Sequence, residues 1–205
     1  NSVILYKCIS FPYKWEKDKV ILNNVKACDS VVFQNDLGQY LFITSLMDEK
    51  STNERKNFCY VHNVMYELDE DLNIIPDSKR ELSEGDYGIR NAGKVIKTKS
   101  NLIRIAQNCT EGMYGKGLVF WALDSYNPYK EHELANIDYK KACNHIMHID
   151  HNGKIEGIHT YNCSAHYEII DFMIFNELPV YYKLYYFLGN RIFKIITKIE
   201  RFIKS

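Results

Sequence analysis

Several familiar functional patterns are missing from this sequence. Its six cysteines include no CxxC pair, so the spacing of a zinc knuckle is absent. Neither GxxxxGK[ST] nor GxGxxG occurs, so the sequence has neither of the two common phosphate-binding motifs. No uninterrupted apolar run reaches the length of a membrane-spanning helix. The sequence opens in a strand-like run rather than a signal peptide, and we expect it to begin partway through a larger domain or to lack preceding residues.

An excess of charge of one sign is also missing. The 26 Lys and Arg residues balance the 26 Asp and Glu residues, and no nucleic-acid-binding motif occurs. Nucleic acid is therefore disfavoured as a partner. The scattered cysteines indicate reduced, buried thiols in the cytoplasm. Nothing in the sequence calls for a cofactor, and we expect none.

What the sequence has is aromatic and β-branched residues in short runs. The 16 Tyr and 10 Phe residues favour strands, and aromatic rings also stack on the C–H faces of sugars. Turn-forming residues separate the runs, and Asn152-Gly153 is typical of a two-residue hairpin loop. The pattern predicts an all-β protein. The expected strands are residues 3–8, 19–22, 30–34, 39–44, 58–68, 93–98, 101–107, 117–123, 130–134, 143–151, 154–160 and 166–175.

The last stretch of the chain differs from the rest. From residue 179 onward, apolar residues recur at helical spacing, while six basic side chains stand against one acidic one. We therefore predict β-propeller blades over residues 1–178 and a basic amphipathic helix over residues 179–205. Such a helix would lie on an anionic membrane surface, on a partner domain or across the propeller itself, and the pattern leaves these alternatives open.

An internal repeat organises the β-rich part. Residues 29–45 align without a gap with residues 91–107, at an offset of 62, and residues 159–171 form a looser third copy. Each copy indicates a strand, a turn and a strand, and a period near 60 with about four strands is typical of a propeller blade. We predict about three blades, with equivalent polar residues converging at the ends of their inner strands. These residues are Asp29, Arg90 with Asn91, and His159, followed by Ser45, Gln107 and Asp171.

The same residues lie in segments that resemble a known family. In chain order the segments are 5–7 (LYK), 11–15 (FPYKW), 29–33 (DSVVF), 40–42 (YLF), 89–93 (IRNAG), 102–109 (LIRIAQNC), 114–115 (YG), 129–131 (YKE), 157–162 (GIHTYN) and 169–171 (IID). Together they resemble the N-terminal propeller domain of the glucosamine inositolphosphorylceramide transferases. The resemblance implies a partial five-bladed propeller akin to arabinanase- and xylosidase-type glycosidases, with further blades upstream. Ser30 and Asn91 replace prolines of the family pattern, and Asn108 replaces an acid.

Polar side chains in these segments form a candidate ligand site. Arginine offers a planar fork of donors that suits carboxylate, phosphate or paired hydroxyls, and Asn and Gln both donate to and accept from sugar hydroxyls. The alternative for the two arginines is structural, with buried hydrogen bonds that join adjacent blades. The candidate substrate-binding residues are Arg90, Asn91, Arg104, Gln107, Asn108, Tyr114 and His159.

Three carboxylates at family-matching positions, Asp29, Glu131 and Asp171, are candidate catalytic residues. Glycoside hydrolysis needs two carboxyl groups roughly 5–5.5 Å or 6.5–9.5 Å apart. The alternative is that each carboxylate accepts backbone N–H bonds at a strand start. His145, His148 and His151 suggest a metal, but residues three apart on a strand point to opposite faces, so we predict no metal site.

The preferred hypothesis is a carbohydrate-binding propeller module of a cytoplasmic glycan-biosynthesis protein. It would bind a sugar or sugar phosphate at the channel mouth and work with a catalytic partner domain, such as a glycosyltransferase or formyltransferase. Two alternatives stay open: a glycosidase-like or glycosyltransferase enzyme that uses the channel carboxylates, and a protein-interaction propeller. The basic helix would add peripheral contact with the inner face of a membrane.

Overall fold

A computed structural model describes residues 1–47, 60–145 and 154–175 of the chain. The chain divides into two compact units, one of Asn1–Ile149 with Ile155–Met173 and one of Asp150–Lys154 with Ile174–Ser205. Almost all of the described residues belong to the first unit. The predicted helix over residues 179–205 and the predicted Asn152-Gly153 turn lie outside the described residues.

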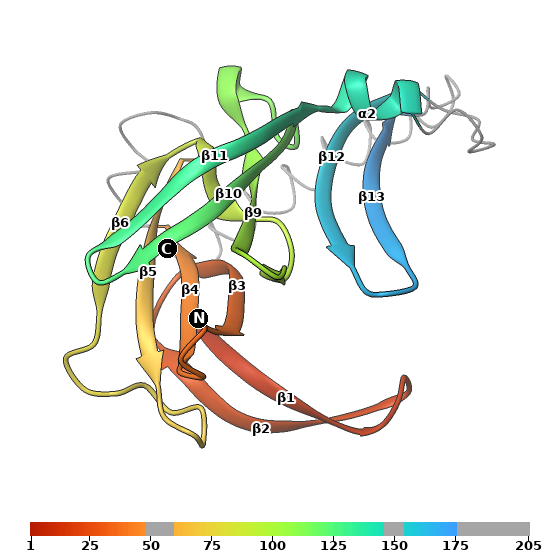
Figure 1. Ribbon diagram of the computed structural model, residues 1–205. Helices are drawn as coiled ribbons and strands as arrows, with labels where there is room; N and C mark the ends of the chain where they lie inside the picture. The colour runs from red at the N-terminus through yellow and green to blue at the C-terminus, as the bar shows by residue number, and fades with distance from the viewer. Residues whose placement is uncertain (48–59, 146–153, 176–205) are drawn as a thin grey trace, which may run out of the picture. The chain divides into compact units, whose positions relative to one another are not determined.

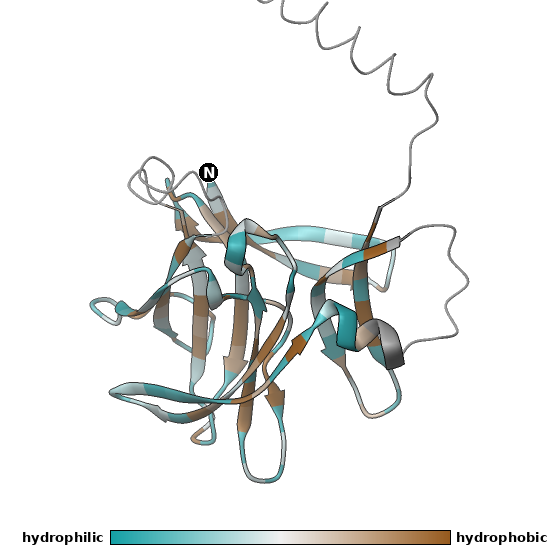
Figure 2. Cartoon of the chain, turned by 90° about the horizontal axis from the view of Figure 1, so that it is seen from above, coloured by the Kyte–Doolittle hydropathy of each residue, from teal (hydrophilic) through white to brown (hydrophobic). Residues whose placement is uncertain are grey.

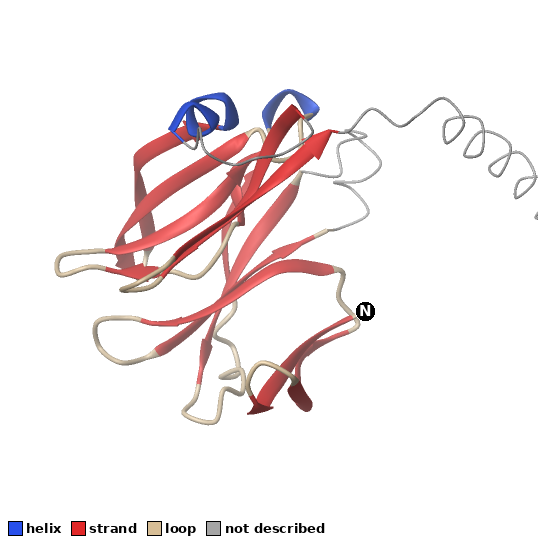
Figure 3. Ribbon diagram, turned by 90° about the vertical axis from the view of Figure 1, so that its right-hand side faces the viewer, coloured by secondary structure: helices blue, strands red, loops and turns tan. Residues whose placement is uncertain are grey.

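The described part of the chain is all-β and consists of antiparallel sheets (Figure 3), which confirms the predicted fold class. The first element is a hairpin of β1 (Ser2–Ser10) and β2 (Lys14–Asn23). β2 begins five residues before the predicted strand 19–22. The prediction was too short because the first half of β2 is charged and exposed, with Lys14, Glu16 and Lys17. Such residues hide a strand from a hydrophobic pattern.

A four-stranded sheet follows, in which each strand pairs with the next one along the chain (Figure 1). Its strands are β3 (Ala27–Gln34), β4 (Tyr40–Leu46), β5 (Val61–Leu68) and β6 (Arg80–Gly85). β4 and β5 are almost wholly buried, which agrees with their apolar sequences. β6 was not predicted, because this edge strand (RELSEG) is polar and mostly exposed.

A second sheet repeats this arrangement in the order β11-β10-β9-β7, with β8 paired to β9. Its strands are β7 (Tyr87–Asn91), β8 (Ile96–Lys97), β9 (Leu102–Asn108), β10 (Gly117–Tyr126) and β11 (Tyr129–Asp138). β4 and β9 are offset by 62 residues, as in the sequence repeat. The repeat therefore corresponds to the second strand of each four-stranded meander.

The segment after the second sheet differs from the prediction. A strand was expected over residues 143–151, but Tyr139–His145 forms helix α2, so the prediction is wrong for residues 143–145. Asp138 explains the helix start, because its carboxylate accepts a 2.8 Å hydrogen bond from the Lys140 backbone N–H. Residues 146–151 lie outside the described part. A final hairpin of β12 (Lys154–Cys163) and β13 (Glu168–Phe175) confirms the last two predicted strands.

Apolar side chains from the first and second sheets share one core cluster. Val31, Phe33, Leu41, Ile43 and Met65 of the first sheet pack with Leu102 and Leu123 of the second. A second cluster contains Ala92, Ile105, Leu118, Ala142 and Ile158, so it joins the second sheet to α2 and β12. Figure 2 shows that hydrophobic residues are concentrated on the strands. Burial of these apolar faces holds the polar strand ends in place.

Candidate functional site

Arg104 is among the most deeply buried of the predicted site residues. Its side chain on β9 is 1% exposed and makes a two-pronged ion pair with Glu131 of β11, with Nε and Nη2 at 2.9 and 2.6 Å from the carboxylate oxygens. Nη1 and Nη2 also donate to the backbone carbonyls of Ile89 and Gly88. Every nitrogen of the guanidinium is thus engaged inside the second sheet.

The surroundings of Arg104 keep its guanidinium charged. Burial alone would lower the pKa of Arg104, but Tyr129 and Glu131 outweigh burial and raise it above the ordinary value. Burial also raises the pKa of Tyr129, whose hydroxyl donates to Glu131 over 2.8 Å. No direct contact among the described residues joins Glu131 to Asp29 or Asp171. The three predicted catalytic carboxylates therefore do not form one group.

Three predicted amide residues also make internal bonds. Asn91 donates to the carbonyl of Asp29 at 2.7 Å and accepts from Arg104 at 3.3 Å. Gln107 donates to the Asn91 carbonyl at 3.3 Å, and the Asn108 side-chain oxygen accepts from Thr110. All three amide residues are buried. They connect strands and turns through polar groups that burial would otherwise leave unsatisfied.

Arg90 has a more open environment. It lies on β7, and its Nε donates to Asp29 of β3 at 2.6 Å, with the two side chains 10% and 18% exposed. Burial would lower the pKa of Arg90, but the hydrogen bond and the charge of Asp29 raise it. Asp29 has a φ of 52°, at a register shift of the β3–β4 pairing between Cys28 and Val31. This irregularity re-aims its side chain out of the regular alternation of the strand.

The adjoining thiol of Cys28 responds to the same environment. Burial raises the pKa of Cys28 to about 11, and the charge of Asp29 adds to this effect. The thiol is therefore protonated at neutral pH and is a poor nucleophile.

Tyr114 contacts both Arg90 and the last hairpin, β12–β13. The Arg90 guanidinium carbon lies 5.2 Å from the centre of the Tyr114 ring, a cation–π distance, and the Tyr114 hydroxyl bonds to His159 Nε2 of β12. Gly115 permits this approach, because it has a φ of +69° and a Cβ there would lie 2.9 Å from the Ile158 carbonyl oxygen. The Ile158 N–H donates to the Gly115 carbonyl at 2.7 Å. The loop and β12 are thereby fixed against each other.

His159 continues the contact to Asp171 of β13. Its Nδ1 lies 3.1 Å from Asp171 Oδ2, and the Thr160 backbone N–H donates to Oδ1. Burial would raise the pKa of Asp171, but the hydrogen bonds from Thr160 and His159 lower it below the ordinary value. Because an ionised carboxylate only accepts, Nδ1 must donate. In a neutral imidazole Nε2 then accepts from the Tyr114 hydroxyl.

Five predicted residues thus form a continuous series of contacts, which we call the five-residue cluster: Asp29, Arg90, Tyr114, His159 and Asp171. They come from β3, β7, the loop before β10, β12 and β13. Asn63 was not among the predicted polar residues, although it donates to the Ile89 carbonyl at 2.5 Å and accepts from Ser45. Its position in an apolar strand was a signal, since a buried polar residue needs partners.

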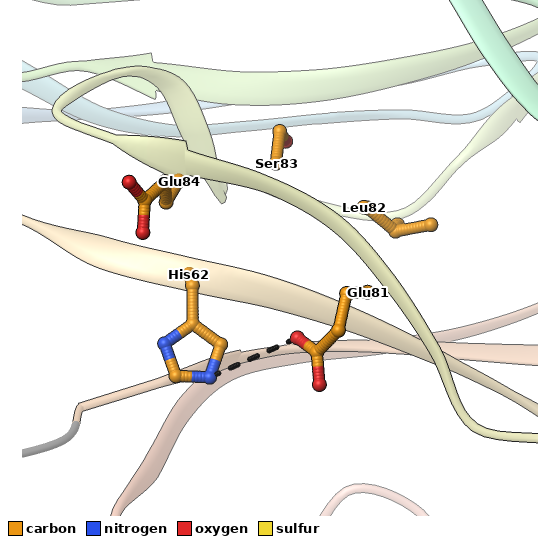
Figure 4. A pocket seen from close by; sticks show the side chains of 5 residues that line it. All are labelled: His62, Glu81, Leu82, Ser83 and Glu84. Atoms are coloured by element: carbon orange, nitrogen blue, oxygen red, sulfur yellow. Dashed lines mark ion pairs between the residues drawn. The ribbon is translucent and has the colours of Figure 1, made fainter.

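Two surface hollows lie elsewhere. One of about 410 Å³ is lined by His62, Glu81, Leu82, Ser83 and Glu84, with His62 Nε2 at 4.0 Å from a Glu81 oxygen (Figure 4). The other, of about 540 Å³, is lined by residues that include Gln39 and Asp69. Neither contains a member of the five-residue cluster. The five-residue cluster is therefore defined by its polar contacts.

Among residues 1–47, 60–145 and 154–175, no group of three or more His, Cys, Asp and Glu side chains could hold a metal ion. The side chain of His145, and all of His148 and His151, lie outside the described part, so the metal prediction there stays a prediction. No helix within the described ranges has the length and apolar character needed to cross a membrane.

The protein is thus an all-β domain of antiparallel sheets, and residues from three of these sheets and one loop form its polar cluster. Comparison with protein families identifies which all-β domain this is. The family described as "Glucosamine inositolphosphorylceramide transferase 1, N-terminal" matches residues 1–155. The chain belongs to this family, which confirms the resemblance seen in the sequence. Comparison with curated protein sequences finds no match.

Proposed function

We propose that the four-stranded first sheet and the five-stranded second sheet are successive blades of a β-propeller. Three features support this proposal: the main path of each sheet is an antiparallel meander of four strands, the second strands of the two paths are offset by 62 residues, and the apolar faces share a core. The two-stranded β1–β2 and β12–β13 sheets are then parts of the neighbouring blades. In a propeller, the inner strands β3, β7 and β12 lie next to the central channel.

We further propose that the domain binds a sugar or sugar phosphate at the five-residue cluster. The observation that carries this proposal is Arg90, whose side chain is 90% buried while Nη1 and Nη2 have no hydrogen-bond partner among the described residues. A buried donor without a partner is costly unless a ligand supplies the acceptor. Carboxylates, an imidazole and a hydroxyl beside it provide the acceptors and donors that sugar hydroxyls require.

The family name points to glycosyl transfer, and this suggests the setting of the domain. We propose a role in glycan assembly beside a catalytic partner domain, in the cytoplasm. The basic, amphipathic sequence pattern of residues 179–205 suits contact with an anionic membrane surface, where lipid-linked glycans are found.

Ligand-observed NMR tests the binding function. We expect saturation transfer from the protein to members of a panel of neutral and phosphorylated monosaccharides, and loss of that transfer in Tyr114→Phe. Tyr87→Phe is the matched control, because the Tyr87 hydroxyl bonds to Glu133 and Asn136, away from the cluster. Binding that survives Tyr114→Phe unchanged would place the ligand elsewhere.

A second candidate function is proton transfer on a bound sugar. The series Tyr114, His159 and Asp171 favours it, because a carboxylate that holds an imidazole in one tautomer is the arrangement by which a hydroxyl is activated. Hydrolysis of an aryl glycoside panel, lost in His159→Gln but not in His132→Gln, would establish this enzyme. His132 is the control because it forms a similar pair with Asp124 at 2.9 Å. Sugar binding without hydrolysis would support only the binding function and would contradict the enzyme.

A further inference from the structure

The five-residue cluster has a charge balance that distinguishes between sugar ligands. The charge of Arg90 is opposed by Asp29 at 2.6 Å. Asp171 adds a negative charge, and its lowered pKa keeps it ionised near neutral pH. The three charged side chains Arg90, Asp29 and Asp171 together carry one net negative charge.

The arrangement of donors leads to the same conclusion. Asp29 already occupies Nε of Arg90, so one of the edges by which a guanidinium grips an anion is taken. Nη1 and Nη2 remain for a ligand oxygen, since no described residue accepts from them. A hydroxyl oxygen can accept there without bringing charge. A phosphate would bring its negative charge close to Asp29 and Asp171, and like charges at short range weaken binding.

The acceptors favour hydroxyl groups as well. Asp171 already accepts from Thr160 N–H and from His159, and a carboxylate has about four acceptor positions in all. A sugar hydroxyl can donate to such a carboxylate and accept from a guanidinium at the same time. A fully ionised phosphate group can only accept, so it cannot donate to the acceptor positions that remain on these carboxylates.

We propose that this site takes an uncharged sugar residue through its hydroxyls and discriminates against sugars that carry phosphate or carboxylate. The inference rests on the proposed sugar-binding function and narrows its ligand class. Phosphate groups of a larger substrate would then bind outside the five-residue cluster.

Matched ligand pairs test the inference. Glucose, galactose, mannose and N-acetylglucosamine are each compared with their 1-phosphate by titration calorimetry. We expect the neutral member to bind with a dissociation constant roughly tenfold lower than that of its phosphate, as expected for a like-charge contact near a protein surface. Equal or tighter binding of the phosphates overturns this inference and leaves the sugar-binding function standing. If no member binds, the proposed function falls as well.

Asp171→Asn locates the source of the discrimination. Removing this charge should bring the ratio of the two dissociation constants toward one. Asp124→Asn is the matched control, because Asp124 also pairs with a histidine but lies outside the cluster, and it should leave the ratio unchanged. An unchanged ratio in Asp171→Asn contradicts the inference.

The wild-type protein offers a second measurement that does not depend on a variant folding. Because salt screens exposed and half-exposed charges, raising the ionic strength from low to about 0.5 M should narrow the ratio. A ratio that stays constant with salt would mean that shape, and not charge, excludes the phosphate.

Discussion

Arg90 and Arg104 were both predicted to bind a ligand from their sequence segments, but their structural environments differ. Arg104 is 1% exposed, and its guanidinium is engaged by Glu131, two backbone carbonyls and Asn91. Arg90 is 10% exposed, pairs with Asp29 through Nε alone and lies against Tyr114. Arg104 thus connects the strands of a single sheet, whereas Arg90 joins two sheets and has two nitrogens, Nη1 and Nη2, that bond to none of the described residues.

This difference shows why a buried ion pair is not by itself a functional site. Such a pair is held together by the cost of leaving either charge alone in the interior. It becomes a candidate binding site only when part of the hydrogen-bonding capacity remains unused. Both arginines were predicted to contact the ligand, and these predictions stay untested. The contacts of Arg104 favour the structural alternative.

The largest expected effect is that of Arg104→Met. It leaves the Glu131 carboxylate buried without its partner and removes donors from the Gly88 and Ile89 carbonyls. We expect the free energy of unfolding to fall by about 3–5 kcal/mol. Urea denaturation followed by circular dichroism measures it. Adding Glu131→Leu should recover part of the loss, and a double variant as unstable as the sum of both single variants would contradict the pair.

Arg90→Met should have a smaller effect on stability. Asp29 is more exposed than the core of the second sheet and can be hydrated when its partner is removed. We expect a loss of about 1–3 kcal/mol in the free energy of unfolding, together with loss of sugar binding. Urea denaturation and ligand-observed NMR on the same sample separate the two effects. Full binding in a folded Arg90→Met protein would remove Arg90 from the site.

Tyr114→Phe should change stability still less. It deletes one hydroxyl that bonds to His159 and keeps the ring against Arg90, so we expect about 0.5–1.5 kcal/mol. The His159 ring environment should also change, which the imidazole NMR signals report. Tyr129→Phe is an informative comparison, because its hydroxyl bonds to Glu131 inside the Arg104 network. That variant should affect stability alone and leave binding intact.

The pH dependence should show the smallest effect. The pKa of Asp171 is lower in the folded protein than its ordinary value, because Thr160 and His159 donate to the carboxylate. Its contribution to stability is present above the unfolded-state pKa, about 3.9, and is lost as pH falls through the folded-state pKa. Since the side chain is 49% exposed, the effect is small. The difference in unfolding free energy between wild type and Asp171→Asn should therefore be larger at pH 6 than at pH 2.5.

An equal difference at the two pH values would mean that the Asp171 carboxylate gains nothing from its hydrogen bonds. The double variant Asp171→Asn with His159→Gln tests the coupling directly. Its loss should be smaller than the sum of the two single losses, because the two residues share one contact.

Much of the fold was predictable because most strands have apolar cores. β4, β5, β9 and β10 are largely buried and were found at nearly their observed positions. The polar edge strand β6 and the short strand β7 were missed. Helix α2 was missed because it has only seven residues, too few for a helical hydrophobic period, and its start is set by hydrogen bonds to Asp138 and to the Lys116 carbonyl. Pairing and capping decide such segments, and hydrophobicity alone does not report them.

The amino-acid sequence by itself determined the all-β class, the 62-residue repeat and the family of this protein. These properties depend on the order of apolar and turn-forming residues along the chain, and this order is the same whether or not the chain is folded. Only the tertiary structure decided how the polar residues group: Asp29 with Arg90, Tyr114, His159 and Asp171, and Glu131 with Arg104. The physical reason is that an ion pair forms between side chains that the sheets bring within reach, here as far as 61 positions apart in the chain.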